Sequence, residues 1–241
     1  MGRPTIILIH GAWHGSWCWD DVAEGVRASG FDVRAVDLPG HDQPGSSSRL
    51  WNRVSDYVDH VHGEIDQIDG DVVLVGHSMG GLVTQRVLET RSVMGAILLA
   101  SSPRRGVGGV VARLAKHSPG QVVGMIGSLS LWSMVADDDQ VRTHLFTPTT
   151  EDAVIRRTGA KLQNESFLAF LSMILRWPRP SKVTTPIQVI AASQDAIFTM
   201  AEQRDLATEY GAPLEVIDCG HDVMLEAEWP ELVKHIVASA T

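Results

Sequence analysis

The sequence is poor in cysteine and in basic residues, and each shortage excludes a class of protein. Cys18 and Cys219 are its only two cysteines, too few for a disulfide framework, so we expect free thiols in a reducing compartment. The chain has 20 Lys and Arg against 29 Asp and Glu, a formal net charge of −9. Its basic residues form no stripe, and close pairs such as Arg104 and Arg105 are isolated. A nucleic-acid partner is therefore not expected, because nothing would neutralise a row of phosphates.

Long apolar runs are also missing. The longest charge-free apolar stretch, residues 122–136, has fifteen residues and contains three Ser and two Gly. A membrane-spanning helix needs about 20 apolar residues, so we expect no membrane association. The first residues show no apolar run long enough for a secretory leader, which predicts a cytoplasmic location. The length of 241 residues fits one α/β domain of ordinary size.

Short apolar segments alternate with amphipathic segments along most of the chain. We expect strands at residues 5–10, 31–40, 71–76, 94–102, 186–193 and 214–220. We expect helices at residues 18–30, 54–65, 79–91, 200–211 and 228–240, with Val22, Val26 and Ala28 facing inward in the first. Residues 41–50 are rich in Gly, Ser and Pro and are predicted to form a loop. The alternation predicts an α/β fold with a mostly parallel sheet of about six strands, covered by helices on both faces.

The alternation breaks between residues 104 and 180. This segment has no good strand but has helical patterns at residues 107–117, 120–136, 150–160 and 163–176. We predict that residues 104–180 form a helical cap over the carboxyl edge of the sheet, and that residues 1–103 and 181–241 form the core. Met and aromatic side chains in the cap favour an apolar acyl or alcohol group in a substrate. The expected substrate-binding residues are Trp13, His14, Leu131, Trp132, Phe167, Phe170 and Ile197.

Ser78 lies where a predicted strand passes directly into a predicted helix. It is the centre of Gly76-His77-Ser78-Met79-Gly80, which fits the pattern Gly-x-Ser-x-Gly. Such a turn raises the serine hydroxyl above the sheet at the amino end of a helix, where backbone N–H groups favour a developing anion. We interpret Ser78 as a nucleophile, with a tight structural turn as the alternative.

A serine nucleophile needs a base and an acid that orients the base. Of the ten histidines, His221 is the best placed, between the last strand and the last helix. His77 is expected to point away from the pocket. Asp195 ends the fifth strand, whereas the fourth strand ends without a carboxylate. The order Ser78, Asp195, His221 is the one expected for a nucleophile on such a turn.

Two backbone N–H groups are expected to stabilise the anion that forms when the serine attacks a carbonyl. One belongs to Met79, at the start of the helix. The other is expected from the loop after the first strand, where Ala12 is the candidate and Trp13 the alternative. Gly11 lets this loop come close, and His10 is expected to order it by hydrogen bonds.

Several motifs taken together resemble the α/β-hydrolase fold superfamily. They are "HGAWHGSWCW", "DLPGH", "GHSMGG", "SQDAIF" and "CGHDVM", in the expected order along nearly the whole chain. The first is most similar to the branch that holds plant methyl esterases and S-selective hydroxynitrile lyases. The resemblance implies an esterase-type triad, a helical cap, a six-stranded core, and neither a cofactor nor a metal.

The resemblance is incomplete at two positions that matter for the lyases. Their pattern has a threonine after the first-strand histidine and a lysine after the catalytic histidine, where this chain has Gly11 and Asp222. An aspartate would repel the cyanide anion that the lysine binds, so a lyase is disfavoured. Ser78 itself disfavours the branches that use an aspartate nucleophile.

These residues predict a serine hydrolase that cleaves small to medium hydrophobic carboxylic esters through an acyl-enzyme intermediate. Its partner is then a small-molecule ester. The alternatives are a ligand-binding receptor on the same fold, a hydroxynitrile-lyase-like activity, and a perhydrolase in which peroxide replaces water. The sequence does not indicate an oligomeric state.

Overall fold

The computed structural model describes residues 2–41 and 51–241, so most of the loop predicted at residues 41–50 lies outside the described residues. Six strands form one sheet in the order β2-β1-β3-β4-β5-β6, and each neighbouring pair is parallel. The strands are β1 (Thr5–Ile9), β2 (Val33–Val36), β3 (Val72–His77), β4 (Gly95–Leu99), β5 (Ile187–Ala192) and β6 (Leu214–Ile217). The predicted six-stranded parallel sheet is confirmed.

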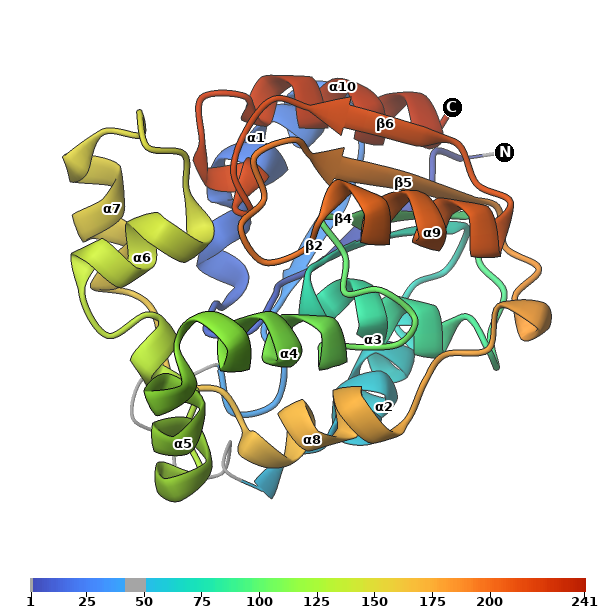
Figure 1. The fold of residues 1–241 in the computed structure, drawn as a ribbon. Helices are drawn as coiled ribbons and strands as arrows, with labels where there is room; N and C mark the ends of the chain where they lie inside the picture. Colours follow the sequence, from blue (N-terminus) through green and yellow to red (C-terminus); the bar gives the residue numbers. More distant parts are fainter. Residues whose placement is uncertain (1, 42–50) are drawn as a thin grey trace.

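Helices cover both faces of this sheet (Figure 1). They are α1 (Asp20–Ala28), α2 (Val54–Asp66), α3 (Met79–Val87), α9 (Met200–Tyr210) and α10 (Trp229–Ser239). Ile6 and Leu8 of β1 belong to the apolar cluster that contains α1 and α10, whereas Ile7 and Ile9 belong to the cluster that contains α2, α3 and α9. Successive side chains of a strand point to opposite faces, which explains why the central strands β1, β3 and β4 are almost entirely apolar.

One inward-facing residue of α1 was predicted wrongly. Val22 and Val26 are buried, but Ala28 is exposed and Ala23 is buried instead. Ala23 lies one residue after Val22 and three before Val26, within the apolar stripe of the helix, whereas Ala28 falls at its frayed end.

Between β4 and β5 the described chain contains helices and no strand. These helices are α4 (Gly108–His117), α5 (Pro119–Ser128), α6 (Asp138–Leu145), α7 (Asp152–Gly159) and α8 (Phe167–Leu175). We call residues 104–180 the helical insertion. Figure 1 shows α5, α6 and α7 gathered on the side of the molecule opposite the two chain termini.

The helix predicted over residues 120–136 is wrong in its second half. The chain leaves α5 at Leu129, whose backbone is left-handed (φ 50, ψ 39). A short 3-10 turn and then α6 follow, and α6 was not predicted. The sequence did contain a signal for the start of α6. Asp137 is an N-cap residue, and its side chain accepts the N–H of Gln140 at 2.9 Å.

A buried polar cluster joins the helical insertion to the core. The Glu165 carboxylate accepts the Tyr57 hydroxyl at 2.7 Å and lies 3.1 Å from Nε2 of His41. The N–H of Gln163 donates to the carbonyl of Trp13 at 2.8 Å. Burial disfavours the charged form of Glu165, yet His41, Tyr57 and the Ser166 N–H together keep its pKa below the ordinary value. The insertion is thus held next to the loop that follows β1.

Cys18 and Cys219 are both free, as predicted, and both are buried. Burial raises the pKa of each thiol. No helix in the described part of the chain combines the length and the apolar character needed to cross a bilayer.

Candidate active site

Ser78 is the single residue between β3 and α3, and its backbone is forced into an unusual conformation (φ 53, ψ −116). The chain can turn this tightly only because the residues two positions away on each side, Gly76 and Gly80, lack side chains. A Cβ atom on Gly76 would lie 2.5 Å from the carbonyl oxygen of Gly80, and one on Gly80 would lie 2.5 Å from that of His10. The strained serine is held by its N–H, which donates to the Leu99 carbonyl at 3.0 Å.

The structure brings Ser78, His221 and Asp195 together from three separate strand ends. Nε2 of His221 lies 2.9 Å from Oγ of Ser78, and its Nδ1 lies 2.9 Å from Oδ2 of Asp195. The other Asp195 oxygen accepts the N–H groups of Ile197 at 2.7 Å and Phe198 at 2.9 Å. The carboxylate can only accept, so Nδ1 carries the proton and Nε2 is free to take one from the serine.

The charge on His221 is controlled by its carboxylate neighbours. Burial lowers the pKa of His221, but the charge and the hydrogen bond of Asp195 outweigh it, with a smaller contribution from Asp222. The net result is a pKa above 6.5. This environment favours the protonated imidazolium form of His221.

A second buried network lies behind this triad. Nε2 of His14 lies 3.0 Å from Oδ2 of Asp222, and its Nδ1 lies 2.7 Å from the Ala12 carbonyl oxygen. His77 points away from the cavity, as predicted, and its Nε2 donates to the backbone carbonyl of His221 at 3.0 Å. Burial and the nearby His221 lower the pKa of His77 to about 3, so it is neutral. The network ties the loop after β1 to the loop that carries His221.

The loop after β1 runs close to the serine. A Cβ atom on Gly11 would lie only 2.9 Å from Cβ of Ser78. His10 orders this loop, since its Nδ1 lies 2.8 Å from the Gly11 carbonyl oxygen and its Nε2 accepts the Leu38 N–H at 3.0 Å. Ala12 lines the same cavity as Ser78 and Met79. The N–H of Met79 also opens α3, where a helix has no internal acceptor for it.

The cavity next to Ser78 has a volume of about 50 Å³ and is walled almost entirely by apolar side chains. Of the predicted substrate-binding residues, Trp13, Leu131, Phe170 and Ile197 line it. The other lining residues beyond Ala12, Ser78 and Met79 were not named as substrate-binding residues: Val107, Val110, Met134, Glu165, Met173 and Phe198. Met173 follows Phe170 by three residues on α8, and this helical spacing was a usable signal.

Three predicted substrate-binding residues do not line this cavity. His14 is held by Asp222 and the Ala12 carbonyl in the network behind the triad. Phe167 packs against the ring of Phe170, with ring centroids 5.8 Å apart. Trp132 is 36% exposed, and it begins the short 3-10 turn after α5 instead of continuing the predicted helix.

One buried group in the described residues has the composition of a metal site. Ligand atoms of His77, His221 and Asp222 lie within 4.8 Å of one another. However, both ring nitrogens of His221 are engaged by Ser78 and Asp195, and Nε2 of His77 donates to a carbonyl. A metal here would have to displace these hydrogen bonds, so the residues fit a hydrogen-bonded network better than a metal centre.

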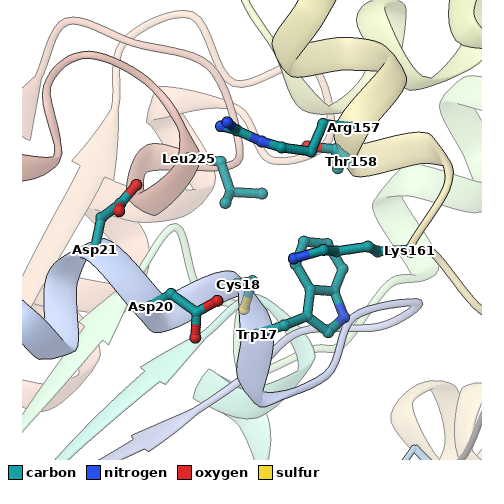
Figure 2. A pocket seen from close by; sticks show the side chains of 8 residues that line it. All are labelled: Trp17, Cys18, Asp20, Asp21, Arg157, Thr158, Lys161 and Leu225. Atoms are coloured by element: carbon teal, nitrogen blue, oxygen red, sulfur yellow. The ribbon is translucent and has the colours of Figure 1, made fainter.

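Other hollows lie near the insertion, and two of them differ in chemistry. One is a charged cleft with a volume of about 180 Å³, which no residue of the triad lines. Figure 2 shows Asp20 and Asp21 of the core facing Arg157 and Lys161 of the insertion across it. A larger groove of about 390 Å³ lies between α4, α5 and α6 and extends to Ala196 and Ile197. It shares Val110, Met134 and Ile197 with the lining of the Ser78 cavity.

Comparison with known proteins finds relatives over part of the chain and similar folds over all of it. An 89-residue segment is 36% identical to the carbendazim hydrolyzing esterase of Nocardioides sp. (strain SG-4G), covering 35% of this chain and 36% of the relative. An 83-residue segment is 31% identical to methylesterase 18 of Arabidopsis thaliana, covering 34% and 32%. The matches thus span about a third of these curated relatives.

The solved structure of polyneuridine aldehyde esterase has a TM-score of 0.78 at 16% identity, with all of both chains covered. A pyrethroid hydrolase from Sphingobium faniae JZ-2 has a TM-score of 0.71 at 22% identity over 98% and 97% of the two chains. At such identities these structures show a shared fold and no more. The family model described as "Alpha/beta hydrolase family" matches residues 6–234, which confirms the resemblance predicted from the motifs. The chain belongs to the alpha/beta hydrolase family.

Proposed function

We propose that this protein is a serine hydrolase that cleaves carboxylic esters. The observation that carries the proposal is the continuous hydrogen-bonded chain Ser78–His221–Asp195, with 2.9 Å at both links, beside the N–H groups of Ala12 and Met79. The named relatives that match segments of the chain are esterases, which supports the same chemistry.

In the proposed mechanism, Oγ of Ser78 attacks the ester carbonyl while Nε2 of His221 takes its proton. Asp195 stabilises the resulting imidazolium, and the N–H groups of Ala12 and Met79 stabilise the oxyanion. His221 then gives the proton to the departing alcohol, leaving an acyl group on Ser78. Water, activated by the same histidine, attacks the acyl-enzyme and releases the acid.

The proposed substrates are small to medium hydrophobic esters. The cavity beside Ser78 presents Phe170, Met173 and Leu131, and its volume of about 50 Å³ suits a short acyl group. These side chains come from the helical insertion, which we propose acts as a cap over the site. The cytoplasmic location stays a prediction from the sequence.

The proposal is tested by active-site labelling. A fluorophosphonate probe should modify the protein at Ser78, and short-chain p-nitrophenyl esters should be hydrolysed. Ser78→Ala should abolish labelling and lower kcat by at least about 10⁴-fold, whereas Ser29→Ala, a change of an exposed serine, should alter neither. Labelling elsewhere, or turnover unchanged in Ser78→Ala, would sink the proposal. A ligand-dependent rise in Tm without turnover would favour the receptor alternative.

A further inference from the structure

We propose that the alcohol part of the substrate binds in the groove between α4, α5 and α6, and that it is a polar, uncharged group larger than the acyl part. This inference rests on the proposed esterase function and deepens it. It assigns the substrate class as short-chain acyl esters of larger, neutral, hydrogen-bonding alcohols.

The groove adjoins the cavity at Ser78. Val110, Met134 and Ile197 line both spaces, so the cavity and the groove lie on two sides of the same three side chains. In the proposal a bound ester passes these side chains, and the cavity and groove act as one elongated binding region with Ser78 in its narrow part.

The groove lies on the side from which the leaving group departs. Ala196 and Ile197, which line it, directly follow Asp195 in the chain. His144, on its α6 wall, is near enough to His221 for the charge of that ring to act on it. The leaving oxygen must face His221 to receive its proton. The carbonyl oxygen faces the opposite way, toward Ala12 and Met79, which line only the cavity.

The two spaces differ strongly in size. The cavity has about 50 Å³ and the groove about 390 Å³. A short acyl chain fills the first, whereas the second accommodates an alcohol of many more atoms. With the carbonyl held at Ser78, this difference in volume predicts that the alcohol half of the ester is larger than the acyl half.

The groove also differs from the cavity in chemistry. Polar side chains of Gln121, Gln140 and Thr143 line it, in addition to His144. Arg113 contributes a positive charge to the groove lining, and this charge is neutralised because the guanidinium pairs with both Glu202 oxygens at 2.9 and 3.0 Å.

His144 adds little charge to the groove at neutral pH. Burial lowers the pKa of His144, with a contribution from His221, so the ring is mostly uncharged at pH 7. Arg113 also donates to the Ile197 carbonyl at 2.6 Å, so three of its N–H groups are engaged within the protein. Among the described residues that line the groove there is no Asp or Glu. These features suit hydroxyl, ether or amide groups rather than an ion.

An isomeric ester pair tests the orientation. One member is the acetate of triethylene glycol monomethyl ether, and the other is a methyl ester of a similar polyether acid. The acetate should have a kcat/KM at least about tenfold higher, and it should also exceed hexyl acetate. Faster hydrolysis of the methyl ester would overturn the orientation. A preference for an acetate whose alcohol carries a quaternary ammonium or a carboxylate would overturn the neutral class.

Variants of the groove test its location. Gln140→Leu and Thr143→Val should each lower the ratio of kcat/KM between the polyether acetate and hexyl acetate by about fivefold, mainly through KM, because each removes a hydrogen-bonding group. The matched control Gln67→Leu, an exposed residue directly after α2, should leave the ratio unchanged. If the ratio is unchanged in both groove variants, the alcohol does not bind in this groove, even if all the esters are cleaved. If no ester is cleaved and Ser78 is not labelled, the proposed function fails first, and this inference fails with it.

Discussion

At the scale of single residues, the candidate site depends on carboxylates that sit on two sides of one histidine. Asp195 contacts Nδ1 of His221 directly, and Asp222 follows His221 in the chain while bonding to His14. Both carboxylates raise the pKa of His221 against the effect of burial. Two measurable consequences follow from this arrangement.

The first consequence is a pH dependence of catalysis. The base is active only when His221 is neutral, so kcat/KM should fall as the pH drops through the pKa of His221. Because this pKa is raised, the midpoint of the acid limb should lie above pH 6.5. The measurement is kcat/KM from about pH 5 to about pH 9 with an ester whose alcohol does not ionise. A midpoint at or below pH 6.5 would contradict the assignment.

The second consequence concerns Asp222. Asp222→Asn should move the acid limb to lower pH, because one carboxylate that raises the pKa of His221 is lost. It should also lower kcat by about tenfold, since His14 and the Ala12 loop lose their buried partner. Asp218→Asn is the control, because Asp218 is fully exposed near the same loop and its charge is screened. If Asp222→Asn changes kcat but does not shift the acid limb of the pH profile, then Asp222 has only a structural role.

At the scale of secondary-structure elements, the helical insertion is fixed to the core by a few buried polar contacts. Glu165 bonds to Tyr57 and lies beside His41, while Gln163 bonds to the loop after β1. Such partners cannot be removed singly without leaving a buried group unpaired.

We therefore expect Glu165→Gln to lower the free energy of unfolding by about 3 kcal/mol, because it removes the carboxylate that pairs with His41. Chemical denaturation at pH 7 measures this loss. The folded-state pKa of Glu165 is below 4.5, so the difference between the two proteins should be full above that pH and should shrink as the pH falls further. Equal stability of Glu165→Gln and of the exposed control Glu24→Gln would contradict this account.

The walls of the cavity are also a property of elements, because α8 contributes Phe170 and Met173. Acetyl and butyryl esters should react at least about tenfold faster than octanoyl esters, since a long acyl chain cannot enter the cavity. Met173→Ala should move the optimum to longer chains. An acyl-length series of p-nitrophenyl esters tests both points, with Leu175→Ala, an exposed position on the same helix, as the control. An optimum at octanoyl in the unmodified protein would show that the cavity does not hold the acyl group.

At the scale of the whole molecule, the parallel sheet brings distant parts of the chain to one edge. Ser78 follows β3, Asp195 follows β5 and His221 follows β6, so the carboxyl ends of three strands supply the three side chains. Parallel strands end at the same edge of the sheet, and each of these three residues lies in a motif that directly follows a predicted strand. The sequence could therefore predict that Ser78, Asp195 and His221 lie together. No such rule fixes where the helices inserted between β4 and β5 lie.

The sequence by itself determined the sheet, the tight turn at Ser78 and the likeness to the alpha/beta hydrolase family, because each depends on local patterns: apolar strands, Gly76 and Gly80 about the serine, and motifs in a fixed order. Only the tertiary structure decided which side chains line the cavity. Residues 167–175 are apolar on nearly every face, so periodicity cannot tell Phe167, which packs aside, from Phe170, which lines the cavity. The bond between His14 and Asp222 joins residues 208 positions apart, and only packing places them together.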